Sequence, residues 1–71
     1  MQSAYTFDVF DTRNTAERQT IPLAQRADTA REIARRLSLR NGVHHVNVSR
    51  GNAFEEYERG ERVSWSTAPL T

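Results

Sequence analysis

Polar and apolar residues alternate at the start of the chain, from residue 4 to residue 11. A period of two residues is typical of a β-strand with one buried face. The residues on the apolar side are Tyr5, Phe7 and Val9, while Phe10 points to the opposite side. A weaker strand is predicted over residues 15–21, pairing back on the first strand. Pro22 follows it, and because proline has no amide hydrogen to donate, this strand lies at a sheet edge or ends there.

The apolar period changes between residues 28 and 40, where a helix is predicted. Apolar residues recur there at the i, i+3, i+4, i+7 spacing of one buried stripe. These residues are Ala30, Ile33, Ala34 and Leu37. Asp28 is the predicted N-cap, and Asn41-Gly42 are residues that tolerate a left-handed C-terminal cap.

Three further strands are predicted after the helix, over residues 43–49, 54–57 and 62–66. Their connections carry turn residues, Arg50-Gly51-Asn52 and Arg59-Gly60-Glu61. The side chains expected to join the core from these strands are Val46, Val48, Val63 and Trp65. Residues 67–71 contain Pro69 and are expected to form a frayed tail.

The predicted order is therefore ββαβββ, within a single domain over residues 1–71. This order indicates an α+β fold in which a small antiparallel β-sheet carries one α-helix on one face. One helix covers only one face of such a sheet. The other face must therefore be polar or must meet a partner.

Composition narrows the class of protein. The 71 residues include no cysteine, so neither a disulfide nor a thiolate metal site is possible. No apolar run approaches the roughly 20 residues that cross a bilayer. The N-terminal residues do not show the basic segment followed by an apolar segment that is typical of a signal peptide. We therefore expect a cytoplasmic location without membrane contact. The net charge of +1 is too small for a nucleic-acid binder that acts by bulk electrostatics.

Charge is distributed unevenly along the chain. Residues 26–40 carry five arginines against two acidic residues, whereas residues 54–62 carry four glutamates against two arginines. The sequence thus predicts a basic helix beside an acidic hairpin. All basic side chains are arginines, whose planar guanidinium groups suit carboxylates and phosphates.

The candidate partner-binding residues are Arg31, Arg35, Arg36, Arg40 and Tyr57. The four arginines form a stripe on the predicted helix that suits a phosphate backbone or a carboxylate-lined protein surface. Glu32 offers a simpler interpretation for some of them, because it lies three residues before Arg35 and four before Arg36. Tyr57 is an amphipathic aromatic residue of the kind that anchors interfaces, although in a small domain such residues are also common in the core.

Residues that suggest catalysis or metal binding have simpler explanations. His44 and His45 are neighbours in a predicted strand, so they should point to opposite faces and should not chelate one ion. Glu55, Glu56 and Glu58 are expected to form a solvated acidic edge that discourages aggregation. The sequence shows no nucleophile with a recognisable base and no glycine-rich phosphate loop. We therefore expect a protein that is not an enzyme and that needs no cofactor or metal.

Several of these residues together resemble a known group of proteins. The shared features are Ala4-Tyr5, Ala30 with Ile33-Ala34 in a basic helix, Gly42 before a valine-containing strand, Gly51-Asn52 followed by Phe54 and Tyr57, and Gly60 before a strand with Trp65. This pattern resembles the small type I-F anti-CRISPR proteins that phages use against the bacterial surveillance complex, and it is most similar to the ninth-named inhibitor family. That family consists of short β-sheet proteins with one helix.

The resemblance implies a function and a partner. It implies a phage-encoded inhibitor, acting in the cytoplasm of the bacterial host cell, that binds the backbone subunits of the CRISPR surveillance complex and blocks target DNA. In that family, basic residues of the helix contribute to this binding. The resemblance therefore implies contact roles for Arg31 and Arg36, which are basic at matching positions. Glu32 differs, because it stands where the family pattern is basic. Two alternatives remain open: a nucleic-acid-binding module that uses the arginine helix, and a homodimeric phage accessory protein. Nonspecific DNA contact, and a monomeric or homodimeric state, also stay open.

Overall fold

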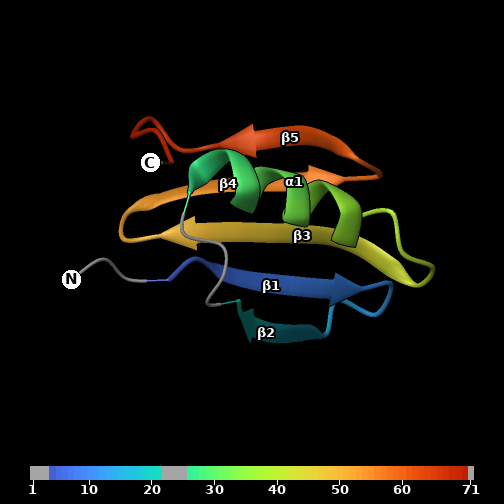
Figure 1. The fold of residues 1–71 in the computed structure, drawn as a ribbon. Coiled ribbons are helices and arrows are strands. Elements are labelled where there is room, and N and C mark those ends of the chain that lie inside the picture. The colour runs from blue at the N-terminus through green and yellow to red at the C-terminus, as the bar shows by residue number, and fades with distance from the viewer. Residues whose placement is uncertain (1–3, 22–25, 71) are drawn as a thin grey trace.

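The computed structural model describes residues 4–21 and 26–70 of the chain. The elements in chain order are β1 (Thr6–Asp11), β2 (Ala16–Thr20), α1 (Ala27–Leu37), β3 (Val43–Arg50), β4 (Ala53–Glu58) and β5 (Glu61–Trp65). The strands form one antiparallel sheet in the spatial order β2-β1-β3-β4-β5, and α1 lies across one face of it (Figure 1). The predicted α+β fold and its ββαβββ order are confirmed.

The predicted pairing of the first two strands is also confirmed. β2 pairs with β1 and forms one edge of the sheet, as expected of a strand that precedes a proline. Pro22 itself lies outside the described residues. The other edge is β5, which a two-residue turn joins to β4.

The core lies between α1 and the sheet. Its helix side is formed by the predicted stripe, of which Ala30, Ala34 and Leu37 are buried. The buried side chains on the sheet side are Tyr5, Phe7, Val46, Val48, Ala53 and Tyr57, while Val9 and Ile33 are partly buried against them. The two alanines present little bulk, so the helix backbone can lie close to the side chains of β3 and β4.

Both predicted ends of the helix are wrong. The N-cap is Arg26, and Asp28 lies in the first turn, where its Oδ1 accepts a hydrogen bond of 2.9 Å from the Thr29 N–H. A carboxylate in that turn still interacts favourably with the helix dipole. At the other end α1 stops at Leu37, after which the backbone forms tighter i→i−3 hydrogen bonds, from Leu39 and Arg40. The Ser38 Oγ donates to the Arg35 carbonyl and accepts from the Gly60 N–H. Gly42 has φ +83° and serves the turn into β3.

The prediction that Val63 and Trp65 belong to the core is wrong, since they are 44% and 57% exposed. Val63 is an extra residue in β5, because Glu56 pairs with Ser64 while Tyr57 pairs with Arg62. Trp65 lies opposite Glu55 on the helix side of the sheet. The helix, however, packs chiefly on β3 and β4, so this edge position stays open to solvent.

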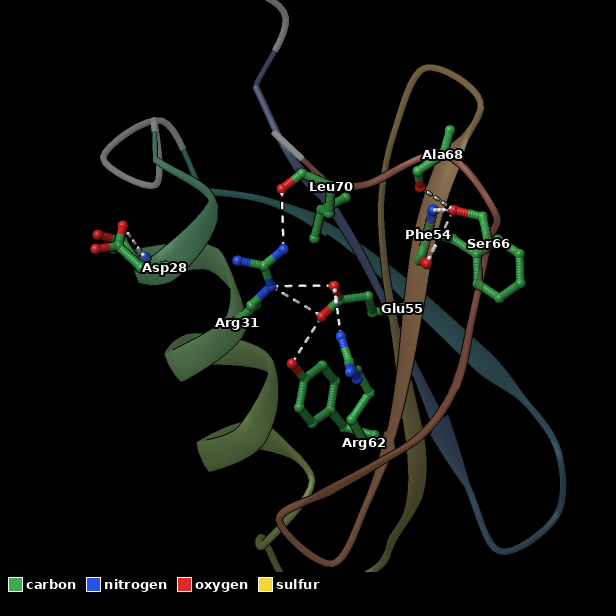
Figure 2. Close-up of polar contacts among 10 residues, drawn as sticks. Asp28, Arg31, Phe54, Glu55, Arg62, Ser66, Ala68 and Leu70 are labelled. Carbon is green, nitrogen blue, oxygen red and sulfur yellow. Dashed lines mark hydrogen bonds and ion pairs between the residues drawn. The ribbon is translucent and has the colours of Figure 1, made fainter.

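The C-terminal segment packs against the domain, so the predicted frayed tail is wrong for residues 67–70. Leu70 is only 1% exposed and belongs to the core. Its carbonyl accepts a hydrogen bond of 3.2 Å from Arg31 Nη2, and the Ser66 Oγ donates to the Ala68 carbonyl at 2.7 Å (Figure 2). Thr71 lies outside the described residues.

The face of the sheet opposite α1 is largely polar. The sequence predicts that this face is either polar or covered by a partner. Its register places the following residues there: Thr6, Asp8, Asn47, Ser49, Glu56 and Ser64. Asp8 forms an ion pair with Arg18 of β2 at 2.9 Å. Phe10 also lies on this face, as predicted, and its ring stacks on that of His45.

The described helix is too short and too polar to cross a membrane.

Candidate interaction surface

Arg31 points inward from the helix to the sheet (Figure 2). Its Nε donates to both carboxylate oxygens of Glu55, at 3.1 and 3.0 Å. Arg62 Nη1 of β5 donates to the same carboxylate at 3.3 Å, and the Tyr57 hydroxyl donates to it at 2.8 Å. We call this arrangement of Arg31, Glu55, Tyr57 and Arg62 the Glu55 network. It connects α1, β4, β5 and the C-terminal segment around one buried anion.

The network changes the interpretation of two predicted partner-binding residues. Glu55 is 3% exposed and Tyr57 is 6% exposed, so neither offers a surface to a partner. The prediction that Glu55 belongs to a solvated acidic edge is therefore wrong, since β4 lies inside the sheet and Glu55 shares the helix-facing side with Tyr57. Arg31 balances the charge of this carboxylate, which is a role within the fold, although its side chain remains 37% exposed.

The Tyr57 hydroxyl provides a test of the network at alkaline pH. Burial, followed by the hydrogen bond to Glu55, raises the pKa of Tyr57 to about 12. An unfolded chain loses this proton near pH 10. The protonated Tyr57 hydroxyl therefore contributes about 2–3 kcal/mol to the free energy of unfolding. This contribution is fully present below about pH 10 and is lost as the pH rises through about 12. Urea unfolding across this range should show a steeper loss in the wild type than in Tyr57→Phe. Parallel profiles for the two proteins would contradict the assignment.

Arg35 and Arg36 lie on the outer side of the helix. Both donate to Glu32, through Arg35 Nη2 at 2.7 Å and Arg36 Nε at 2.9 Å, which is the internal helix support considered from the sequence. The hydrogen bonds from Arg35 and Arg36 lower the pKa of Glu32 to about 2. The Arg35–Glu32 and Arg36–Glu32 ion pairs are exposed, so they add little to the stability of the fold. An anionic group of a partner can therefore replace Glu32 with only a small loss of free energy.

Arg36 and Arg40 lie beside a hollow between α1 and β2. The hollow has a volume of about 230 Å³ and a partly apolar lining. We call it the helix–β2 groove, and its lining residues are Gln19, Ile21, Ile33, Arg36, Leu37 and Arg40. The predicted arginine stripe is thus divided, because Arg31 reaches toward β4 while Arg36 and Arg40 border this groove.

The two histidines behave differently from the prediction. His44 and His45 do not diverge: their Nδ1 atoms lie 2.8 Å apart and share a hydrogen bond. The cause is an irregularity in the pairing of β1 with β3, where Phe10 pairs with His45 and Asp11 pairs with Val43. This leaves His44 as an extra residue, and a β-bulge of this kind turns consecutive side chains toward the same side.

Sequence reasoning missed the Glu55 network and the exposed edge at β5. One signal for the network was available, because a period of two places Glu55 on the same face as Tyr57. At β5, the Arg62 guanidinium lies over the exposed Trp65 ring, 4.3 Å from its centroid. That contact depends on the extra residue in β5, which strict alternation does not predict.

Comparisons of the chain with protein-family models, with curated proteins and with solved structures found no match. The functional conclusion therefore rests on this chain's residues and geometry, together with the resemblance described above.

Proposed function

We propose that this chain is a non-catalytic, phage-encoded inhibitor that binds the backbone subunits of a type I CRISPR surveillance complex and blocks target DNA. It docks through the helix–β2 groove. The observation that carries this proposal is the pair of exposed arginines, Arg36 and Arg40, beside a groove with apolar lining. The fold, a short antiparallel sheet with one helix, is also the one that the resemblance implies.

The groove combines the two features that protein interfaces use for affinity. Ile21 and Ile33 are only partly buried, so they offer apolar surface that is removed from water when a side chain of the partner enters. Arg36 and Arg40 add planar guanidinium groups that recognise carboxylates with two parallel hydrogen bonds. Arginine is enriched among the few residues that supply most of the binding energy of an interface. The partner surface is therefore expected to present an apolar side chain flanked by carboxylates.

We propose a different pair of helix residues from the pair that the resemblance implies. The resemblance assigns contacts to Arg31 and Arg36, and only Arg36 borders the groove. Arg31 instead holds the helix to β4 through Glu55, so it acts as a positioning residue. Arg40 joins Arg36 because it lies four residues later, one turn along the same side of the chain.

The test is a gel shift of target DNA by a purified type I-F surveillance complex, with and without the chain. We expect the wild-type chain to prevent DNA binding and the Arg36→Ala/Arg40→Ala variant to need at least about tenfold more protein, because truncating a desolvated arginine costs about 2–5 kcal/mol. Arg13→Ala/Arg18→Ala removes the same charge from the exposed β1–β2 hairpin and should inhibit as the wild type does.

Three results would contradict the proposal. One is the absence of inhibition together with no co-elution of the chain and the complex. Another is equal loss of inhibition in both double variants, which would indicate bulk charge. The third is a shift of random duplex DNA by the chain alone that weakens steeply as salt rises, since this would indicate direct phosphate binding. Light scattering on a sizing column would reveal a homodimer, the other alternative.

A further inference from the structure

Three side chains with metal-ligating atoms meet at one end of the sheet. They are His44 and His45 at the start of β3 and Glu58 at the end of β4, the strand ends drawn on the right in Figure 1. Their ligand atoms all lie within 4.8 Å of one another. The His44 and His45 Nδ1 atoms are 2.8 Å apart, and Glu58 Oε1 lies 3.8 Å from His44 Nδ1.

The backbone accounts for this convergence. The bulge at His44 brings both imidazoles to the same side of β3, as described above. Glu58 follows Tyr57, which pairs with Val46, so the next step of the register places Glu58 beside His45. The chain turns back at once after Glu58 through Arg59 and Gly60, both with positive φ, and Glu58 pairs with Glu61 across this turn. The three ligands therefore come from paired strands and not from a long loop.

One of the two imidazoles is also held by packing. The Phe10 ring stacks on the His45 ring with centroids 4.2 Å apart and an interplanar angle of 13°. The His44 ring meets that of His45 edge-on, at 83°. Stacking limits the rotation of His45, so less conformational entropy is lost when this side chain binds a ligand. The His44 and Glu58 side chains are 57% and 40% exposed, so both can adjust around a bound ion.

We propose that His44, His45 and Glu58 bind one divalent transition-metal ion through two imidazole nitrogens and one carboxylate oxygen. Two imidazoles and a carboxylate are donors that suit copper, nickel and zinc better than magnesium or calcium. With metal–nitrogen bonds of about 2.0–2.1 Å, two nitrogens lie about 2.9 Å apart at a right angle and about 3.4 Å apart at a tetrahedral angle. The observed 2.8 Å is the length of the hydrogen bond between the two rings, and a small separation of the nitrogens reaches either spacing.

Small movements complete this site. The ion takes the place of the hydrogen bond between the two Nδ1 atoms. The ring that donates this bond transfers its Nδ1 proton to water and is protonated at Nε2 instead, and the rings turn so that both Nδ1 lone pairs face the ion. The Glu58 oxygen moves about 1 Å closer to His44 to become a ligand in the same coordination plane. Water fills the remaining positions, since the three side chains lie at the surface end of the sheet.

The test is isothermal titration of the untagged chain with CuCl2, NiCl2 or ZnCl2. We expect one ion per chain, with Cu²⁺ bound most tightly, as the general affinity order of divalent ions requires. The chain has only two histidines and no cysteine, so His44→Gln/His45→Gln removes every imidazole and should abolish binding. Glu58→Gln should weaken binding by at least about tenfold, because even the loss of a residue that only orients a ligand costs that much.

Glu56→Gln is the matched control, since Glu56 lies two residues earlier on the same face of β4 and outside the cluster. It should bind Cu²⁺ as tightly as the wild type. Circular dichroism would verify that each variant is folded. The proposal is overturned if the wild type shows no saturable binding, if the variant without histidine binds equally well, or if Glu56→Gln and Glu58→Gln weaken binding to the same extent.

Discussion

Replacing Arg31 by methionine should destabilise the protein by about 3 kcal/mol, whereas the same change at Arg36 should cost less than about 1 kcal/mol. Both residues lie on the same helix, and methionine retains the length of the side chain and a good helix propensity. The two positions differ in their partners. Arg31 contacts a Glu55 side chain that is 4% exposed, whereas Arg36 contacts a Glu32 side chain that is 47% exposed.

The two expected losses of stability differ because an unpaired charge is unfavourable inside the protein and tolerated in water. Without Arg31, the Glu55 carboxylate keeps Arg62 as its one cationic partner among the described residues, and the Leu70 carbonyl loses the Arg31 donor. Breaking a buried ion pair by removing one partner costs about 3–5 kcal/mol, and Arg62 offsets part of this cost here. Without Arg36, Glu32 remains exposed to water and paired with Arg35.

Urea unfolding monitored by the single tryptophan would measure both changes. A whole domain of this size is stable by only about 4–10 kcal/mol, so the loss at Arg31 should lower the unfolding midpoint by a third or more. A double-mutant cycle with Glu55→Gln should give a coupling of about 0.5–3 kcal/mol with Arg31, because neutralising Glu55 removes the charge that Arg31 compensates. Equal and small losses for Arg31→Met and Arg36→Met would contradict the Glu55 network.

The same comparison separates folding from binding in the proposed function. If Arg31 only positions the helix, then Arg31→Met should lose inhibition of the surveillance complex in proportion to its unfolded fraction. Arg36→Ala/Arg40→Ala should lose inhibition while it remains folded. A stability measurement beside each gel shift therefore distinguishes a positioning residue from a contact residue.

Local periodicity was sufficient to predict the elements. Alternation through Tyr5, Phe7 and Val9 and the helical spacing of Ala30, Ala34 and Leu37 depend on backbone geometry alone. The residues on each stripe are buried or partly buried in the structure. The ends of the helix were predicted less well. Its last turn contacts a distant part of the chain, because the Ser38 Oγ accepts a hydrogen bond from the Gly60 N–H, 22 residues away, and a local pattern does not contain this contact.

The errors in side-chain direction share one physical origin. An extra residue in a strand reverses the alternation beyond it, and such a residue depends on the register of two paired strands. His44 and Val63 are both extra residues of this kind. The first brings two histidines together, and the second places Arg62 and Trp65 on one side. A pattern read along a single strand contains no information on this pairing, so neither the histidine pair nor the Arg62–Trp65 contact could be predicted from it.

Leu70→Ala should destabilise the protein by about 2–5 kcal/mol, although the residue lies at the end of a segment with a proline and little periodicity. Leu70 is among the largest fully buried side chains of the core. Truncating a buried leucine removes apolar contact and leaves a cavity, and both contribute to the loss. Pro69→Ala, which changes an exposed neighbour, should stay within about 0.5 kcal/mol of the wild type.

The Leu70 result also tests how the C-terminal segment is held. The Leu70 side chain fills the core while its carbonyl accepts from Arg31, so the segment closes the Glu55 network from the side of the C-terminus. Hydrogen exchange should therefore show faster exchange in β4 and β5 for Leu70→Ala than for Pro69→Ala, because loss of the side chain also releases the carbonyl from Arg31. If the segment were frayed, the two variants would have the same unfolding midpoint and the same exchange rates.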